Sequence, residues 1–189
     1  SIKNLKDKFI NFVEKTPSLG KAFLCIDEKN NKEILKKIKN KNFYTYGVNK
    51  NANFHIFNVE QNKLFSKFDL KIKIPGNFSI IKNIKIPLIG LHNIKNAASA
   101  VAVSFLIGIR VSIIKNGLLN FKGVQRRFNF LFKKGNTLFY DDYAHHPTEI
   151  KSVLDGVKKV YKKKKIICVF QPHRISRLKD LKKEFSESF

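Results

Sequence analysis

The sequence predicts an α/β fold built in two parts, and three stretches carry this prediction. Between residues 2 and 46, segments of helical spacing alternate with short apolar runs, which is the rhythm that builds a parallel sheet. Between residues 53 and 88, apolar and polar residues alternate, which is typical of antiparallel strands. From residue 137 an apolar run leads through a polar loop into another helix, so a second α/β unit follows the first.

The first part combines a parallel unit with a small antiparallel β-meander. Apolar residues spaced three and four apart predict its helices, and short apolar runs predict its strands. A parallel unit followed by a meander indicates an elaborated nucleotide-binding domain. The expected elements are helices over 2–13 and 31–39, strands over 22–26 and 43–46, and meander turns at Asn62, Gly76 and Asn83.

A long helix is expected from the G-L-H-N run at residues 90–93 to about residue 107, where Gly108 ends it. Asn93 and Asn96 lie three apart and share one face of its first turn. Carboxamides there can donate to and accept from a purine edge. The alternative is that Asn93 caps the helix and Asn96 faces solvent. Ser112 is expected to cap a second helix that runs to about residue 119.

A boundary between the two parts is expected at residues 123–128, G-V-Q-R-R-F. Adjacent residues of an extended segment point to opposite sides. One of Arg126 and Arg127 can therefore reach a phosphate while the other pairs with an acidic residue or the partner domain. The alternation of Phe128, Phe130 and Phe132 predicts a strand after the boundary.

The loop Y-D-D-Y-A-H-H-P-T-E at residues 140–149 is the centre of the second part. It joins a predicted strand to a helix whose first position is Pro147, and open α/β sheets bind ligands where strand ends feed helix N-termini. A second loop, Q-P-H-R at residues 171–174, follows an apolar run over 166–170 that is expected to form a strand. A well-capped polar loop is the alternative for the first of these loops.

Composition gives a formal net charge of +24, from 38 Lys and Arg against 14 Asp and Glu. Lysines are spread along every segment, so we expect most of this charge to be solvated surface and no nucleic-acid partner. Where lysine is the default cation, an arginine indicates a need for its planar five-donor fork. Arginine and histidine are concentrated in the loops described above: Arg126, Arg127, Arg174, Arg177, His92, His145, His146 and His173.

Cys25 and Cys168 each lie within an apolar run, which predicts buried strand thiols in a reducing, cytoplasmic compartment. Neither has metal-ligand spacing. No secretory signal is visible, and no apolar run approaches the ~20 residues that span a bilayer, so no membrane partner is expected. The chain begins with Ser and contains no Met, from which we expect an internal piece of a longer protein.

Four motifs in this order resemble the Mur ligase family: G-L-H-N-x-x-N-A, G-V-x-R-R-F, D-D-Y-A-H-H-P-T-E and F-Q-P-H-R-x-S-R. The resemblance runs from about residue 2 to the end, and the last two motifs are the specific ones. It implies a whole enzyme with a UDP-binding domain, a central ATPase domain and a C-terminal Rossmann-like domain. Residues 1–125 would be the second part of the central mononucleotide-binding domain, and residues 126–189 the first part of the C-terminal domain.

The resemblance also implies a reaction. ATP, with Mg²⁺, phosphorylates the lactyl carboxylate of UDP-N-acetylmuramate in cytoplasmic peptidoglycan precursor synthesis. The amine of L-alanine attacks the acyl phosphate, and a tetrahedral intermediate expels phosphate to leave an amide. The Q-P-H-R loop favours this activity over murein-peptide recycling. A recycling ligase, a cyanophycin-synthetase-like relative and a basic nucleic-acid-binding module remain the alternatives.

Carried over residue by residue, the resemblance implies a nucleotide site. Asn93 and Asn96 would bind adenine, with His92 beside them. Arg127 would contact the ATP phosphates, where a guanidinium offsets the charge that builds up on a transferring phosphoryl group. Asp142 would accept hydrogen bonds from the ribose hydroxyls.

An acceptor and alanine site follows from the same resemblance. Arg174 and Arg177 lie three apart at a helix start, so they can grip a carboxylate or acyl phosphate from one face. His145 or His173 would orient the incoming amine. Tyr143 would line this site. The catalytic residues would be His145, His173, Arg174 and Arg177.

The family's phosphate-binding loop, G-x-x-G-K-[ST], is absent, because Gly20-Lys21 is followed by Ala22 and lacks the upstream glycines. The Lys and Ser/Thr of that loop, and the Mg²⁺ ligands, are expected before residue 1. We therefore expect these 189 residues alone to have no ligase activity, and ATP turnover by them would contradict this.

Overall fold

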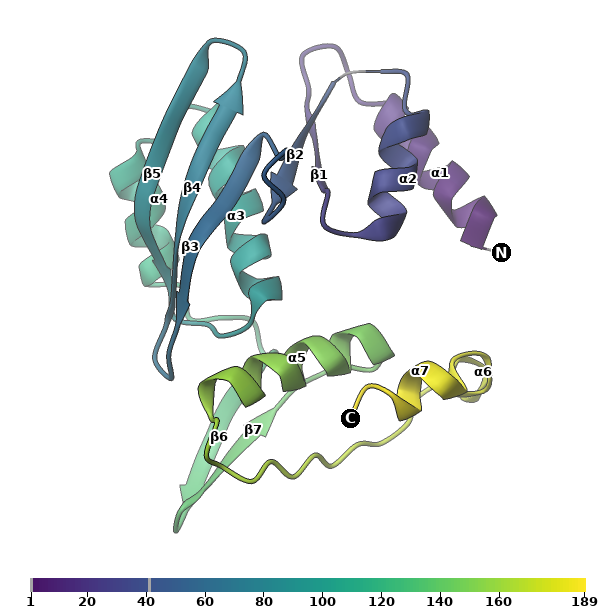
Figure 1. The fold of residues 1–189 in the computed structure, drawn as a ribbon, viewed down its shortest axis with the longest axis vertical. Helices are drawn as coiled ribbons and strands as arrows, with labels where there is room; N and C mark the ends of the chain where they lie inside the picture. The colour runs from purple at the N-terminus through teal and green to yellow at the C-terminus, as the bar shows by residue number, and fades with distance from the viewer. Residues whose placement is uncertain (1, 41) are drawn as a thin grey trace.

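The computed structural model describes residues 2–40 and 42–189, which form an upper and a lower part in Figure 1. The upper part comprises α1 (Ile2–Glu14), β1 (Ala22–Cys25), α2 (Lys29–Lys37), β2 (Phe43–Gly47), β3 (Phe54–Gln61), β4 (Ser66–Ile74), β5 (Asn77–Ile86), α3 (Leu91–Leu106) and α4 (Val111–Leu119). The lower part comprises β6 (Asn129–Lys134), β7 (Thr137–Asp141), α5 (Pro147–Val160), α6 (Ile175–Asp180) and α7 (Lys182–Ser186).

The strands of the upper part form one five-stranded sheet in the order β1-β2-β3-β4-β5. β1, β2 and β3 run parallel, and β4 and β5 continue antiparallel, so the predicted change of pattern is confirmed. The meander is nevertheless no separate sheet, since Phe54 and His55 of β3 pair with Tyr46 and Gly47 of β2. Pairing β3 on both edges removes the exposed strand edges that two small sheets would have.

The turn predicted at Asn83 is wrong, because β5 runs through this residue. Asn83 has a positive φ of 56°, and its backbone N–H donates to Asp69 Oδ1 over 2.7 Å. Asp69 also accepts from Asn58 Nδ2 over 2.9 Å. The register of β4 and β5 shifts beside this point, so the asparagine marks a bulge. The turns at Asn62 and Gly76 are confirmed as the links between strands.

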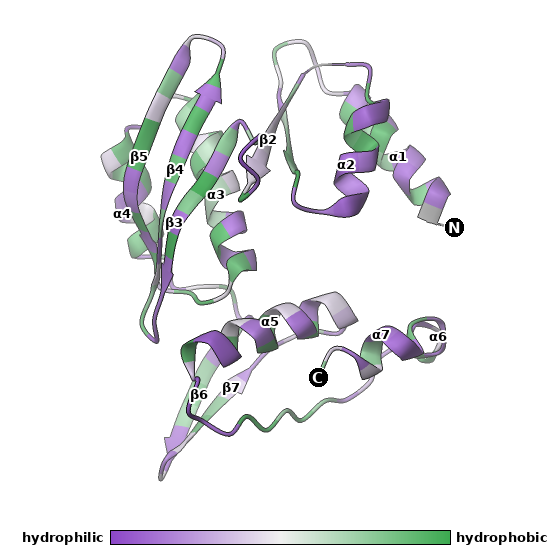
Figure 2. Cartoon of the chain, viewed as in Figure 1, coloured by the Kyte–Doolittle hydropathy of each residue, from purple (hydrophilic) through white to green (hydrophobic). Residues whose placement is uncertain are grey.

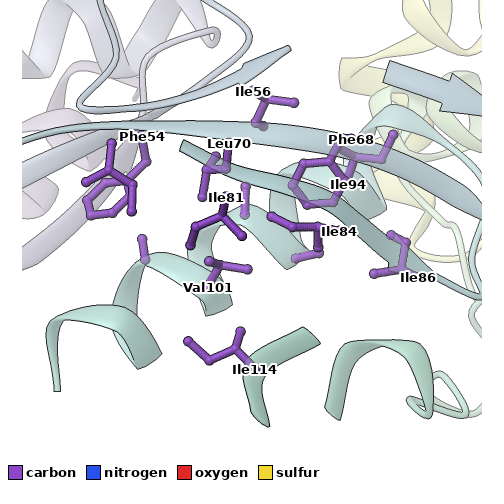
Figure 3. Close-up of a cluster of buried hydrophobic side chains, with 14 residues drawn as sticks. Phe54, Ile56, Phe68, Leu70, Ile81, Ile84, Ile86, Ile94, Val101 and Ile114 are labelled. Carbon is purple, nitrogen blue, oxygen red and sulfur yellow. The ribbon is translucent and has the colours of Figure 1, made fainter. Parts of the chain in front are cut away.

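The main core lies between the sheet and the helices α3 and α4, as Figure 3 shows. Phe54, Phe68 and Ile94 are completely buried there, and burying such a side chain stabilises the fold by about 1.5–3 kcal/mol. Ala98 and Ala102 are also fully buried, which lets α3 lie close to the sheet. Together with Ile94, these residues fix the N-terminal half of α3 against the sheet. A smaller cluster joins α1 and α2 to β1 and β2.

Helix caps differ from the sequence prediction in one place. Gly108, with a φ of +83°, follows the end of α3 as predicted. The predicted cap of α4 by Ser112 is wrong, because Arg110 is the N-cap residue and Ser112 lies inside the helix. The sequence offered a preferred capping residue, but the chain enters the helix two residues earlier.

The lower part is a two-stranded antiparallel hairpin with α5 packed between it and α3 (Figure 1). The strand predicted over residues 166–170 is wrong, since this run pairs with no strand among the described residues. It is an extended, largely apolar stretch in Figure 2, and the Val169 side chain is 95% exposed.

The prediction of a buried thiol is confirmed for Cys25 and wrong for Cys168, which is exposed because no neighbouring strand covers it. Within residues 2–40 and 42–189, no helix has the length and hydropathy that crossing a bilayer requires.

Candidate functional site

The first turn of α3 presents His92 toward the lower part. Gly90 is the N-cap residue with a φ of +98°, and a Cβ at this position would lie 2.6 Å from His92 Cε1. The buried Nδ1 of His92 has no hydrogen-bond partner in the part of the chain that the structure describes. Burial lowers the pKa of His92, the charge of Asp142 acts to raise it, and Arg127 and Lys95 lower it further. His92 is therefore neutral at pH 7, close to two predicted site residues.

Asn93 and Asn96 are presented differently. Asn93 is half-buried, and its Nδ2 donates to the carbonyl of Ile89 over 2.8 Å. Asn96 is exposed on the next turn. The alternative prediction had two parts. Its first part, a cap by Asn93, is wrong because Gly90 is the N-cap residue. Its second part, a solvent-facing Asn96, is confirmed.

The adjacent arginines lie in a turn, so the extended segment predicted for them is wrong. Arg126 and Phe128 have positive φ values of 58° and 51°, which bend the chain between the two parts. Arg126 Nε lies 3.5 Å from Asp141 Oδ2, and its guanidinium lies 4.8 Å from the centre of the Tyr143 ring. Arg127 Nη1 lies 3.8 Å from Glu149 Oε1. Each arginine therefore pairs with a different carboxylate.

Asp142 is held by backbone donors on both sides of its loop. Its Oδ2 accepts from the N–H of Phe128 over 2.8 Å, and its Oδ1 accepts from the N–H of Ala144 over 2.7 Å. The N–H of Tyr143 donates to the carbonyl of Arg126 over 2.7 Å. These bonds tie the linker to the end of β7. A carboxylate fixed in this way is a stationary acceptor, which is what recognition of hydroxyl groups requires.

The helix start after this loop organises two histidines. His146 is the N-cap of α5 and its Nδ1 accepts from the N–H of Thr148 over 3.3 Å, with Pro147 at the first position as predicted. Glu149 Oε2 accepts from the N–H of His145 over 3.0 Å and lies 3.5 Å from His145 Nδ1. The same ring nitrogen lies 3.0 Å from the carbonyl of Tyr143. The His145 ring is thus held between a carbonyl and a carboxylate.

Sequence reasoning missed the part that Glu149 plays. Its carboxylate contacts both Arg127 and His145, and no role in the site was predicted for it from the sequence. Partial burial acts to raise the pKa of Glu149, but the His145 N–H, the charges of His145 and Arg127 and the His146 N–H outweigh burial and hold the pKa below 4.5. The signal in the sequence was an acidic residue three positions after a histidine pair.

Helix α6, which follows the second predicted loop, reaches the first loop through one residue. Arg177 Nη1 donates to the carbonyl of His145 over 3.3 Å. Arg174 is the N-cap residue of α6 with a φ of +66°, and it and His173 are exposed. Of the predicted acceptor site, Tyr143, His145 and Arg177 are therefore brought together, and His173 and Arg174 remain apart at the surface.

A cavity of about 250 Å³ lies where the two parts meet. Leu88, Ile89 and Asn93 line it from the upper part, and Arg127 and Phe128 from the linker. Tyr140 and Tyr161 close it, with their hydroxyl oxygens 2.9 Å apart. Burial and the Tyr161 hydroxyl raise the pKa of Tyr140, so its hydroxyl stays protonated at neutral pH. Among the described residues no group of three or more His, Cys, Asp or Glu could hold a metal ion.

Comparison with known proteins identifies the class to which this arrangement belongs. Residues 1–104 match the Mur ligase middle domain, and residues 126–189 match the glutamate ligase domain of Mur ligases. The chain therefore belongs to the Mur ligase family.

Within the family, the chain is similar to the UDP-N-acetylmuramate–L-alanine ligase of Pelagibacter ubique, with 59% identity over 190 residues that cover 100% of the chain and 41% of that protein. The enzyme of the same name from Brachyspira hyodysenteriae is 38% identical over 196 residues, covering 100% of the chain and 40% of the relative. The chain thus spans about two fifths of the length of these relatives.

Solved structures agree on the fold. The UDP-N-acetylmuramate-alanine ligase MurC of Thermotoga maritima superposes with a TM-score of 0.64 at 25% identity, over 84% of the chain and 38% of that structure. MurF of Acinetobacter baumannii superposes with a TM-score of 0.67 at 22% identity, over 87% of the chain and 34% of that structure. The predicted mixed α/β fold is confirmed.

Proposed function

We propose that this chain belongs to an ATP-dependent ligase that joins L-alanine to UDP-N-acetylmuramate in the cytoplasm. The relatives that carry this name support the proposal. The observation that supports it most is the hydrogen bond from Arg177 to the carbonyl of His145, 32 residues apart in the chain. It joins the two most specific family motifs, since Arg177 ends the second motif and His145 lies in the first.

In this proposal, residues 1–125 are the second part of a central ATP-binding domain and residues 126–189 the first part of a C-terminal domain. The nucleotide would lie at their junction. Asn93 and Asn96 would hold adenine, with His92 beside them. Asp142 would accept from the ribose, and Arg127 would contact the phosphates. The proximity of His92 to Asp142 and Arg127 supports this assignment.

Each proposed residue acts through a charge or a fixed hydrogen bond. ATP supplies the phosphoryl group that activates the carboxylate, and Mg²⁺, whose ligands we expect outside this chain, would bind the phosphates. Arg127 offsets negative charge on the phosphates and must exchange its long contact with Glu149 for them. Arg177, joined by Arg174, would bind the carboxylate of L-alanine or the acyl phosphate, since guanidinium forks match carboxylate and phosphate geometry.

His145 and His173 would orient the amine of L-alanine. The His145 ring has carbonyl and carboxylate neighbours that fix its direction, which supports a positioning role at the acceptor site. His173 is exposed in the present arrangement, so closing of the second loop over the site would have to bring it in.

The test is a ligation assay on the full-length protein with ATP, Mg²⁺, UDP-N-acetylmuramate and an amino acid. We expect phosphate release that requires L-alanine, and a product whose mass equals that of the two substrates less one water. Preference for a tripeptide over L-alanine would assign the protein to murein-peptide recycling. Absence of amino-acid-dependent ATP hydrolysis, with nucleic-acid binding that falls steeply with salt, would overturn the ligase proposal.

A further inference from the structure

A largely buried carboxylate at the carboxyl edge of the sheet takes no part in the proposed reaction. Asp27 follows β1, and its side chain is only 10% exposed. Its Oδ2 accepts from the N–H of Val48 and its Oδ1 from the N–H of Asn49, both over 3.0 Å. The loops that leave β1 and β2 are thereby fastened to one carboxylate.

Gly47, the last residue of β2, makes room for this carboxylate. A Cβ at this position would lie 2.6 Å from Asp27 Oδ1 and 2.7 Å from Oδ2, distances that real Cβ atoms do not adopt. The φ of Gly47 is +149°, which L side chains rarely take. The strand end therefore encloses Asp27 so closely that a side chain has no space.

The cation that faces Asp27 comes from the N-terminal end of α3. Lys95 Nζ lies 3.2 Å from Asp27 Oδ2 and 3.3 Å from Glu28 Oε1, and the Lys95 side chain is only 18% exposed. Burial acts to lower the pKa of Lys95, but the charge of Asp27 and the other contacts outweigh it and raise the pKa. Lys95 is therefore charged at neutral pH, and this ion pair is shielded from solvent.

Lys95 lies two residues after Asn93 and one before Asn96. Core packing of Ile94 holds one side of this end of α3, and the Lys95 anchor holds the side that faces Asp27. A helix turns through a fixed angle at each residue, so the anchor helps to set the direction of both carboxamides. We propose that the Asp27–Lys95 pair is a positioning device for nucleobase selection, which holds Asn93 and Asn96 so that the site prefers adenine to guanine. This inference rests on the proposed function, in which these asparagines contact adenine.

The two purines differ in the hydrogen bonds that they can form with a carboxamide, and this difference is the basis of the proposed selectivity. Adenine presents an amino donor beside the acceptor N7, whereas guanine presents two acceptors, O6 and N7, at the same edge. A carboxamide whose direction is fixed can pair its oxygen with the donor and its nitrogen with the acceptor of adenine. A carboxamide on a loosened turn loses its aligned pair with adenine and can rotate so that its nitrogen donates to guanine O6, so selectivity falls when the anchor is lost.

The experiment measures dissociation constants for ATP and GTP, each with Mg²⁺, on the full-length protein. For Lys95→Met we expect the Kd for ATP to rise about five- to tenfold and the Kd for GTP to change less than about twofold. The kcat at saturating ATP should stay within about twofold. Lys95→Arg, which keeps a cation within reach of Asp27, should restore the ATP preference. Gly47→Ala places a Cβ against the Asp27 carboxylate and displaces it from Lys95, so this variant should reproduce the Lys95→Met result.

Lys6→Met is the matched control, because it removes the Lys6–Glu33 ion pair between α1 and α2 and should leave both constants unchanged. An unchanged ratio of the two constants in Lys95→Met, or an equal weakening of both nucleotides, would overturn the inference and leave only a structural role. Should Gly47→Ala fail to fold, the Lys95 variants decide. An unmodified protein that prefers ATP but does not ligate L-alanine would sink the proposed function alone, whereas one that ligates L-alanine without preferring ATP would sink only this inference.

Discussion

At the scale of single residues, Arg177 makes the contact on which the proposed acceptor site depends. Replacing it by Ala removes the donor to the His145 carbonyl and the guanidinium proposed to bind L-alanine. A hydrogen bond to a charged group contributes about 1.5–3 kcal/mol, so kcat/KM for L-alanine should fall roughly 10- to 100-fold. The Kd for ATP should stay unchanged. Lys179→Ala, an exposed position on the same helix, is the control. Equal losses in the two variants would contradict a specific role for Arg177.

Glu149 gives a prediction about pH. Its pKa is lowered below 4.5 in the folded protein, so the stability it contributes is fully present above about pH 4.5 and is lost as the pH falls through the folded pKa. Glu149→Gln keeps an oxygen for the His145 N–H but removes the charge. Thermal unfolding at pH 7 should show a loss of about 0.5–1 kcal/mol that disappears as the pH falls well below 4.5.

The comparison for Glu149 is Glu60→Gln, which removes an exposed pair with Lys67. Exposed pairs contribute little, so this variant should stay close to the unmodified protein at neutral pH. A Glu149→Gln deficit that persists unchanged at pH 3.5 would mean that shape rather than charge carries the effect.

At the scale of secondary-structure elements, periodicity predicted most of the fold and failed where a neighbour decides the outcome. The helices α1, α3 and α5 follow from apolar spacing and from Gly108 and Pro147, because those signals are local. Residues 166–170 have the composition of a buried strand, yet a strand exists only if a partner offers a hydrogen-bonded ladder. Asn83 is of a residue type common in turns, but its N–H donates to Asp69 on the adjacent strand and it forms a bulge within β5. Cross-strand partners of this kind leave no local pattern.

The candidate site divides in the same way. His92 at the start of α3, and Asp142 and His145 between β7 and α5, could be placed from the sequence because glycine and proline mark those helix starts. The positions of His173 and Arg174 depend on how α6 packs, which the sequence does not encode locally. Asp27 belongs to no recognisable motif. Its contacts with Gly47 of β2 and Lys95 of α3 form only in the folded chain, so the sequence alone did not indicate it.

Two helical glycines, Gly117 in α4 and Gly156 in α5, are expected to respond differently to alanine. A Cβ at Gly117 meets nothing within 4 Å, so Gly117→Ala should stabilise the protein by about 1 kcal/mol through helix propensity. A Cβ at Gly156 would lie 3.1 Å from the backbone Cα of Gly90, which cannot rotate away. Gly156→Ala should therefore give no gain in free energy of unfolding, as chemical denaturation will measure. A gain at Gly156 equal to that at Gly117 would show that the two parts do not pack this closely.

At the scale of the whole molecule, the two parts contribute different halves of one junction. The upper part holds Asn93 and His92 on a helix set by the core, and the lower part brings Asp142 and Glu149 to it through the turn at Arg126 and Arg127. Tight packing at Gly90 and Gly156 fixes how near these halves come in the present arrangement. Any change in the angle between the parts would move the proposed phosphate and ribose contacts together, relative to the purine contacts.

The net charge of +24 leads to a prediction about salt. Lysines distributed over the surface repel one another in the compact state, and raising the ionic strength from 0.01 to 0.15 M shortens the screening length from about 30 to about 8 Å. The Tm of the 189-residue chain should therefore rise with NaCl, by roughly 2–4 °C for each kcal/mol gained. Replacing the exposed Lys163 and Lys164 by Glu should make the rise smaller, because it removes repulsion near the end of α5. A Tm that is constant or falls with NaCl would show that the lysine charges are already compensated in the folded chain.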